Sequence, residues 1–146
     1  SYCSTCDAPL YKDKDVVVVG GGNAAVEGAI LISKYANKVH LIYRGDSLYR
    51  PEKVLLKQFQ ECKNIDLHLN SQISEITEDN NGVNGVKIIK SKQEEKLMCD
   101  GLFIEIGADP RLELEIEFAK SIGQVYYTSG IKYSSSKVIE GLKNCN

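Results

Sequence analysis

The sequence predicts a three-layer α/β fold with a central parallel sheet, helices on one face and an antiparallel β-meander on the other. Four valines at positions 16–19 form an apolar run without alternation, which is typical of a strand buried on both faces of a parallel sheet. Between positions 73 and 99, shorter segments rich in β-branched residues are separated by polar turns, as in a meander of antiparallel strands.

The first part of the chain has the pattern of a strand, a helix and a second strand. The first strand is expected over Asp15–Val19 and ends at three consecutive glycines. A helix is expected over Ala24–Ala36 with Asn23 as its N-cap, because an asparagine side-chain oxygen accepts a hydrogen bond from the first turn. Lys38–Tyr43 is the second strand. Helical spacing puts four residues on the inner face of the helix: Val26, Ala29, Ile30 and Ser33.

A second helix and a set of short strands follow. Pro51 suits the first turn of this helix, because proline lacks the N–H that a first turn leaves unpaired. One stripe of the helix carries Val54, Leu55, Gln58 and Phe59, and Cys62 lies near its end. Strands are expected at Ile65–Leu69, Ile73–Thr77, Val83–Ile89 and Glu95–Cys99, of which the last three form the meander.

The last third returns to the parallel sheet and then becomes ambiguous. Gly101–Ile106 is apolar in character and ends at Gly107, which predicts another parallel strand. Leu112–Ala119 could be a loop or a helix, and Gln124–Tyr133 has strand composition. We expect one domain over positions 1–146, with an uncertain tail over 112–146.

Composition restricts the class of protein. Of the 146 residues, 42% are hydrophobic and 26% charged, as in a soluble globular protein. The net charge of −2 provides no global positive field, so we expect neither nucleic acid nor a membrane as partner. No apolar run approaches the roughly 18 residues of a membrane span, and the first residues lack a signal-peptide pattern, so we expect a cytoplasmic protein. The odd number of cysteines, five, argues against a disulfide-stapled secreted scaffold.

A glycine motif, Gly20-x-Gly22-x-x-Ala25, follows the first predicted strand and opens the first predicted helix. The first glycine permits a tight turn, the second lets the backbone approach a pyrophosphate, and the small third residue lets helix pack on strand. The helix N-terminus favours the anionic phosphates. The motif therefore predicts a Rossmann-like domain that binds a dinucleotide; the alternative is a glycine turn used only for packing.

The end of the second strand should select between NADP and NAD. An acidic residue there would accept a hydrogen bond from a ribose 2′-hydroxyl, whereas arginine would favour a 2′-phosphate. Arg44 and Arg50 could hold a phosphate through charge-assisted hydrogen bonds, and the alternative is that both are solvated loop charges. Asp46 could serve a 2′-hydroxyl instead. We expect NADPH, with NADH still possible.

Cys3 and Cys6 form a Cys-x-x-Cys pair followed by Asp7. We expect no metal here, because no second pair completes four zinc ligands and the other three cysteines lack metal-ligand spacing. A redox-active disulfide is favoured over a packing pair, since this spacing can lower one thiol's pKa. Asp7 could relay protons to and from a thiolate, or could be a helix-capping or turn residue.

Four stretches together resemble the pyridine-nucleotide domain of low-molecular-weight thioredoxin reductases: CSTCD, VVVVGGGNAAVEGA, KVHLIYRGDSLYRPEK and GLFIEIGADP. The resemblance runs from Ser1 to about Arg111. It carries the family's redox and catalytic roles onto Cys3, Cys6 and Asp7. It carries cofactor binding onto Gly20, Gly22, Asn23, Ala25 and Glu27, together with Arg44, Arg50 and Gly107.

The resemblance implies why a dithiol and a nucleotide site share one domain. In the family, FAD stands between NADPH and the disulfide, and the nucleotide domain rotates so that the flavin meets each in turn. It further implies Cys6 as the cysteine that faces the flavin, Cys3 as the one that attacks a thioredoxin-like disulfide, and a homodimer for the full-length protein.

Departures from the family pattern leave alternatives open. The family's His-Arg-Arg-x-x-x-Arg motif is here Tyr43 to Arg50, with the histidine and second arginine absent. The chain has no glycine motif of a flavin domain, and Glu140–Asn146 lacks the second glycine and the aspartate of the family's closing FAD-contacting stretch. We therefore expect the isolated chain to lack FAD and to be inactive. A hydroperoxide-reductase flavoprotein component shares the motifs, and a non-catalytic NAD(P)-binding redox sensor or a remnant is the rival.

Overall fold

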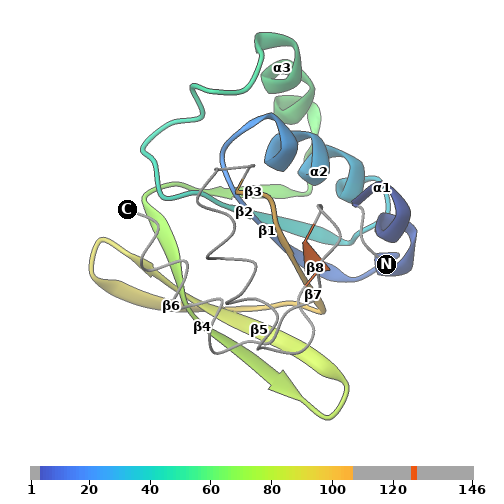
Figure 1. The fold of residues 1–146 in the computed structure, drawn as a ribbon, viewed down its shortest axis with the longest axis vertical. Coiled ribbons are helices and arrows are strands. Elements are labelled where there is room, and N and C mark those ends of the chain that lie inside the picture. Colours follow the sequence, from blue (N-terminus) through green and yellow to red (C-terminus); the bar gives the residue numbers. More distant parts are fainter. Residues whose placement is uncertain (1–3, 107–125, 128–146) are drawn as a thin grey trace.

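The computed structural model describes residues 4–106 and 126–127. They form three helices, a 3-10 turn and eight strands in the order that follows (Figure 1). The elements are α1 (Ser4–Asp7), η1 (Ala8–Tyr11), β1 (Asp15–Val19), α2 (Asn23–Ser33), β2 (Lys38–Ile42), α3 (Lys53–Glu61), β3 (Ile65–His68), β4 (Ser71–Asp79), β5 (Gly82–Lys90), β6 (Gln93–Met98), β7 (Gly101–Ile104) and β8 (Tyr126–Tyr127). Within this part of the chain, no helix combines the length and the apolar character that crossing a bilayer requires.

The strands make two sheets. The larger has the order β3-β2-β1-β7-β8 with every neighbouring pair parallel, and the smaller is the antiparallel meander β4-β5-β6. Strand β1 lies at the centre of the larger sheet, where Val16 pairs with Val39 on one side and with Gly101 on the other. The predicted return of the 101–106 segment to the parallel sheet is therefore confirmed.

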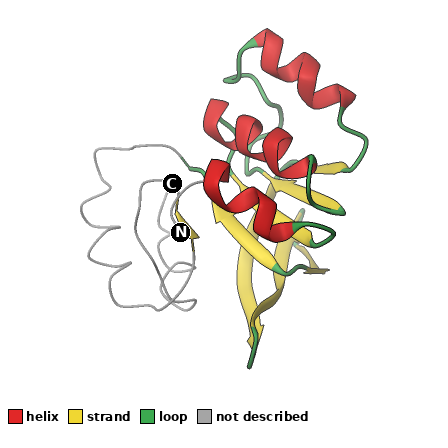
Figure 2. Cartoon of the chain, turned by 90° about the vertical axis from the view of Figure 1, so that its right-hand side faces the viewer, coloured by secondary structure: helices red, strands yellow, loops and turns green. Residues whose placement is uncertain are grey.

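Both faces of β1 are covered, which explains why its valines do not alternate with polar residues. Val16 and Val18 pack with the helices, whereas Val17 packs with the meander. All three are fully buried, and each such side chain contributes roughly 1.5–3 kcal/mol through the hydrophobic effect. The helices lie on one side of the parallel sheet and the meander on the other (Figures 1 and 2), so the predicted three-layer α/β, Rossmann-like class is confirmed.

Helix α2 differs from the prediction at both ends. Gly22, not Asn23, is the N-cap, because the Asn23 Oδ1 atom accepts a hydrogen bond of 3.1 Å from the backbone N–H of Glu52 instead. The helix ends at Ser33 rather than Ala36. Asn64, from the loop before β3, donates through Nδ2 to the carbonyls of Ser33 (2.8 Å) and Ala36 (3.1 Å) and so closes this end.

The predicted apolar stripe of α3 is half right. Leu55 and Phe59 pack against the helix-side core, but Val54 is 67% exposed and Gln58 faces solvent. The helix begins at Lys53 with Glu52 as N-cap, so Pro51, which is buried, precedes its first turn. Of the tail, the described pair Tyr126–Tyr127 is a strand, as its composition predicts; Gly107 and Leu112–Ala119 lie outside the described residues.

Candidate functional site

The glycine turn lies at the carboxyl end of β1, where the chain enters α2. Gly20 has a φ of +146°, a conformation that side-chain-bearing residues rarely adopt, and its N–H donates to the carbonyl of Ile42 at 3.0 Å. A Cβ on Gly20 would collide with the carbonyl of Glu105 and lie 2.8 Å from the Cβ of Ala25. Small residues are thus required at Gly20 and Ala25, because the strand, the turn and the helix pack closely against one another here.

Gly22 has a different environment from Gly20. A Cβ built on it would meet no atom within 4 Å, so this side of the turn opens away from the protein. Gly22 is also the N-cap of the eleven-residue helix α2, whose positive dipole end and unpaired N–H groups favour an anion. Asn23 and Glu27 on this helix are exposed. The turn therefore combines tight packing at Gly20 with an open approach at Gly22.

Tyr43, which follows β2, lies across this turn. A Cβ on Gly21 or on Gly45 would overlap its ring, so both glycines make room for the tyrosine. Burial raises the pKa of Tyr43, as does the hydrogen bond that it donates to Tyr49. Tyr43 thereby joins the glycine turn to the loop after β2. Sequence reasoning treated Tyr43 only as a substitute for the family's histidine and missed this packing.

The loop after β2 also carries the predicted basic residues. The Arg50 guanidinium donates a hydrogen bond to Tyr49, which lowers the pKa of that phenol, and it lies 5.8 Å from the centroid of the Tyr49 ring. Arg44 is exposed at the start of the loop. Asp46, the acidic alternative, is exposed and accepts a hydrogen bond of 2.9 Å from Ser47. The structure thus links Arg50 to Tyr43 through Tyr49.

Asp7 is a buried acid that follows the Cys-x-x-Cys pair in the sequence. It is 2% exposed, and neither carboxylate oxygen has a hydrogen-bond partner in the structure. It occupies the N-cap position of η1, as the capping alternative predicts, but its side chain makes no capping hydrogen bond. A buried carboxylate without hydrogen-bond partners costs folding free energy.

The short helix α1, which contains Cys6 and Asp7, packs against α2. The contact is close at Gly28, where an added Cβ would lie 3.8 Å from the Ser4 Cβ and 3.3 Å from the Glu105 Oε1. Helix α2 therefore has the glycine turn at its start and the segment with Cys6 and Asp7 along its side. Cys3 and Gly107 lie outside the described residues.

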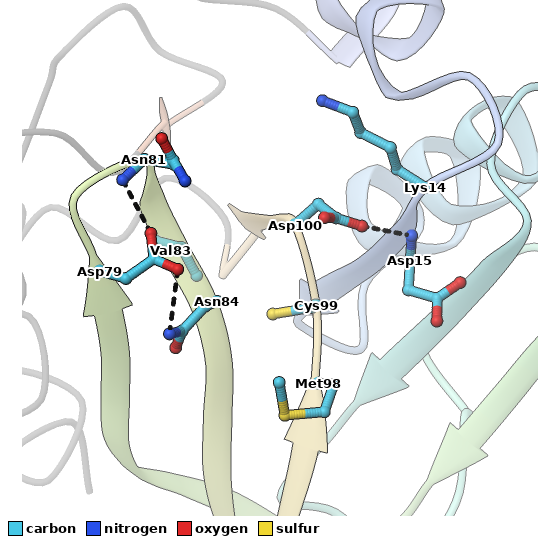
Figure 3. A pocket seen from close by; sticks show the side chains of 9 residues that line it. All are labelled: Lys14, Asp15, Asp79, Asn81, Val83, Asn84, Met98, Cys99 and Asp100. Carbon is cyan, nitrogen blue, oxygen red and sulfur yellow. Dashed lines mark hydrogen bonds between the residues drawn. The ribbon is translucent and has the colours of Figure 1, made fainter.

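A pocket of about 330 Å³ lies at the other end of β1, between the start of that strand and the meander (Figure 3). Asp100 and Asp15 line it, with a hydrogen bond of 3.0 Å from the Asp15 N–H to the Asp100 carboxylate. Cys99 also faces it, and burial raises the pKa of that thiol to about 12. Because Gly20 stands at the opposite end of β1, this pocket is separate from the glycine turn.

Of the other isolated cysteines, Cys99 is buried and Cys62 is half-buried, as expected of packing residues. Cys145 lies outside the described residues. The structure also brings His40, Asp66 and His68 together, a grouping that sequence reasoning missed. Their meeting depends on the register between β2 and β3, which the sequence does not reveal.

Comparison with known proteins agrees with this architecture. Residues 1–130 match the family model of pyridine nucleotide-disulphide oxidoreductases. The thioredoxin reductase of Escherichia coli O157:H7 is 41% identical over 82% of this chain and 41% of its own length. That of Vibrio cholerae is 37% identical over 97% of this chain and 46% of its own length.

Solved structures give the same result. The thioredoxin reductase of Streptococcus pyogenes MGAS5005 superposes with a TM-score of 0.69 at 34% identity, covering 86% of this chain and 42% of that one. The chain therefore spans less than half the length of the relatives that it matches. By its sequence and by its fold, the chain belongs to the pyridine nucleotide-disulphide oxidoreductase family, among relatives that are thioredoxin reductases.

Proposed function

We propose that this chain is the NADPH-binding and disulfide-bearing domain of a thioredoxin-reductase-like flavoprotein. In such a protein, electrons from NADPH would reach the Cys3–Cys6 disulfide by way of FAD and would then reduce a thioredoxin-like protein. The carrying observation is the glycine turn, where Gly20 is closed by its packing and Gly22 opens at the N-terminus of α2. This combination suits a pyrophosphate, because it offers backbone N–H groups and the helix dipole without a side chain in the way.

The residues that hold the nucleotide follow from that turn. Gly20 and Ala25 keep β1 and α2 close, and Gly22 leaves space for the pyrophosphate. Asn23 fixes the start of α2 to the start of α3 through its bond with Glu52, and Glu27 is exposed one turn further along. Gly107 rests on the family resemblance alone, and NADH is the alternative donor because Asp46 could serve a 2′-hydroxyl.

Arg44 and Arg50 are the proposed contacts to the 2′-phosphate. Both follow β2, and parallel strands end at one edge of the sheet, so this loop lies on the same side as the glycine turn. The connection from Arg50 through Tyr49 to Tyr43, whose ring lies over Gly21, supports this assignment.

Cys3, Cys6 and Asp7 are the proposed catalytic residues. When bound to the flavoprotein, FAD would supply the chemistry that turns a hydride into an electron pair for a disulfide. The Cys3 thiolate attacks the acceptor disulfide and forms a mixed disulfide, and one acceptor sulfur leaves as a thiolate. The Cys6 thiolate then displaces the second acceptor sulfur and closes the Cys3–Cys6 bond, so that one disulfide forms as another is reduced.

Asp7 moves the proton in this scheme. Its carboxylate is buried and has no hydrogen-bond partner in the structure, which suits a group whose partner is a thiol. Cys6, which precedes Asp7 in the sequence, must lose its thiol proton before the second displacement can occur. The acceptor and the homodimer are proposed from the family resemblance, and the cytoplasmic location from the sequence composition.

The test is to mix the chain with NADPH and thioredoxin, with and without a supplied FAD-binding domain, and to follow the nicotinamide absorbance. We expect NADPH to bind in both cases but to be oxidised only with the flavin domain, and Cys6→Ser to abolish the oxidation without abolishing binding. Rapid oxidation by the chain alone would show that no flavin intermediary is needed. Binding without oxidation in the presence of a competent flavin domain would favour a redox sensor.

A further inference from the structure

Two imidazoles and a carboxylate meet at the edge of the parallel sheet, between β2 and β3. His40 pairs in register with Asp66, and Ile42 with His68, so the three polar side chains are on one face of the two strands. The Nδ1 of His40 lies 3.1 Å from the Nε2 of His68. One ligand atom from each of the three residues falls within 4.8 Å of the others.

The two nitrogens are hydrogen-bonded in the structure, with donor and acceptor set by the tautomers, and their distance also suits two ligands on one ion. Zinc–nitrogen bonds are about 2.0–2.1 Å long, so two imidazole nitrogens on one ion stand about 2.9–3.4 Å apart for angles between about 90° and 110°. The observed 3.1 Å lies inside this interval.

We propose that His40 Nδ1, His68 Nε2 and the Asp66 carboxylate bind a divalent transition-metal ion of the zinc class, with water completing the coordination. The ion joins β2 to β3, which is the edge strand among the described residues. Two imidazoles and one carboxylate are a recurrent zinc ligand set that leaves an open position. The site is independent of the nucleotide and disulfide roles proposed above.

Lys38 is the present partner of Asp66. Its Nζ lies 2.7 Å from the Asp66 Oδ2, and the two side chains are 42% and 47% exposed. An exposed ion pair of this kind contributes only about 0–1 kcal/mol, so an incoming dication displaces the lysine at little cost. Lys90 and Glu95 of the meander also act on His68, with opposite charges. Lys38 is therefore the main competitor for the ion.

The chain contains two histidines, which makes imidazole nitrogen NMR a direct probe. Zn²⁺ is titrated into the nitrogen-15-labelled chain while the four ring-nitrogen signals are followed. We expect the His40 Nδ1 and His68 Nε2 signals to shift together and to saturate at one ion for the pair. If Zn²⁺ bound only to the cysteines, the ring-nitrogen signals of both histidines would not shift. A response of one ring alone, of the opposite nitrogens, or of neither ring would overturn the proposal.

Variants separate binding from folding. We expect His68→Gln and Asp66→Asn to weaken the Zn²⁺ response of His40 by about 10- to 100-fold, as the loss of a metal ligand or its support does. Lys38→Gln should increase the affinity for Zn²⁺, whereas a variant with a damaged fold would lose affinity. Lys87→Gln is the matched control, since Lys87 makes an ion pair of 2.6 Å with Glu75 on the meander. Equal affinity in Lys38→Gln and Lys87→Gln, or no loss in the two ligand variants, would refute the site.

Discussion

At the scale of single residues, two glycines of one turn are small for different reasons. Gly20 is required by the protein itself, because its φ is +146° and any Cβ would meet the backbone of Glu105. Gly22 is not required by the protein, because its Cβ direction is open. Folding therefore accounts for the first glycine, and the proposed ligand accounts for the second.

Gly22→Val should abolish NADPH binding and leave the fold intact. The branched side chain would occupy the space proposed for the pyrophosphate, yet it meets no protein atom within 4 Å at Cβ. Isothermal titration calorimetry measures the first effect and the thermal midpoint measures the second. Unchanged affinity in a folded variant would remove the nucleotide from this turn.

Gly20→Ala should instead lower the free energy of unfolding. The positive φ and the contact with Glu105 together cost about 1–3 kcal/mol in strain. Urea unfolding of this variant beside Gly22→Val tests the contrast. Equal stability of the two variants would contradict the distinction drawn between the two glycines.

Arg44→Ala and Arg50→Ala should each weaken NADPH more than NADH. A hydrogen bond to a charged group contributes about 1.5–3 kcal/mol, or roughly 10- to 100-fold in affinity, and NADH lacks the 2′-phosphate that would receive it. Calorimetry with both nucleotides gives the ratio. Lys96→Ala, which removes an exposed charge from β6, is the control. Equal losses for the two nucleotides would assign the arginines to packing or to the pyrophosphate.

At the scale of elements, α2 is held at both ends by groups from later in the chain. The backbone N–H of Glu52 donates to the Asn23 side chain at its start, and the Asn64 side chain donates to the carbonyls of Ser33 and Ala36 at its end. This is why an Asn23 cap and a helix extending to Ala36 were wrong expectations. Local propensity suggested both, and partners 29 and 31 positions away decided otherwise.

Asn64→Ala should lower the free energy of unfolding by about 1–3 kcal/mol, because two part-buried hydrogen bonds at the end of α2 are lost. The measurement is urea unfolding followed by circular dichroism. Asn80→Ala, in the exposed turn between β4 and β5, is the matched control and should change little. A loss no larger than that of the control would show that water replaces Asn64 at these carbonyls.

The pairing of β2 with β3 should be sensitive to acid. Burial lowers the pKa of His40 and His68 below 6.5, so the unfolded chain binds more protons than the folded chain as the pH falls through that value. The free energy of unfolding should therefore decline below pH 6.5. The Asp66 carboxylate works against this decline because it raises the pKa of both histidines, whereas the Lys38 charge lowers their pKa and works with it. Unfolding measured across this range in the chain and in His68→Gln, which removes one of the two groups, should show a shallower decline in the variant. Parallel curves would contradict the assignment.

At the scale of the whole molecule, features encoded locally were predictable and features that depend on register were not. The valine run, the glycine turn and the meander are read directly from neighbouring residues, and the fold class follows from them. The packing of Tyr43 over Gly21 and the meeting of His40 with His68 depend on how β2 is set against its neighbours. Val54 is exposed because α3 packs against the core through Leu55 and Phe59. The four residues of the predicted stripe were compatible with more than one rotation of the helix about its axis, so the sequence did not determine which of them would be buried.

The central place of β1 has a consequence for how the chain folds. One neighbour, β2, follows closely in sequence, but the other, β7, comes after the entire meander; Asp15 and Asp100, which are 85 positions apart, are hydrogen-bonded across this junction. Closing so long a loop before its contacts form makes folding slow. During synthesis, one edge of β1 lacks its neighbouring strand until Gly101–Ile104 emerges from the ribosome. A chain cut after residue 100 should consequently lack the cooperative unfolding transition of the full chain in calorimetry, and a sharp transition in the truncated form would contradict this order of events.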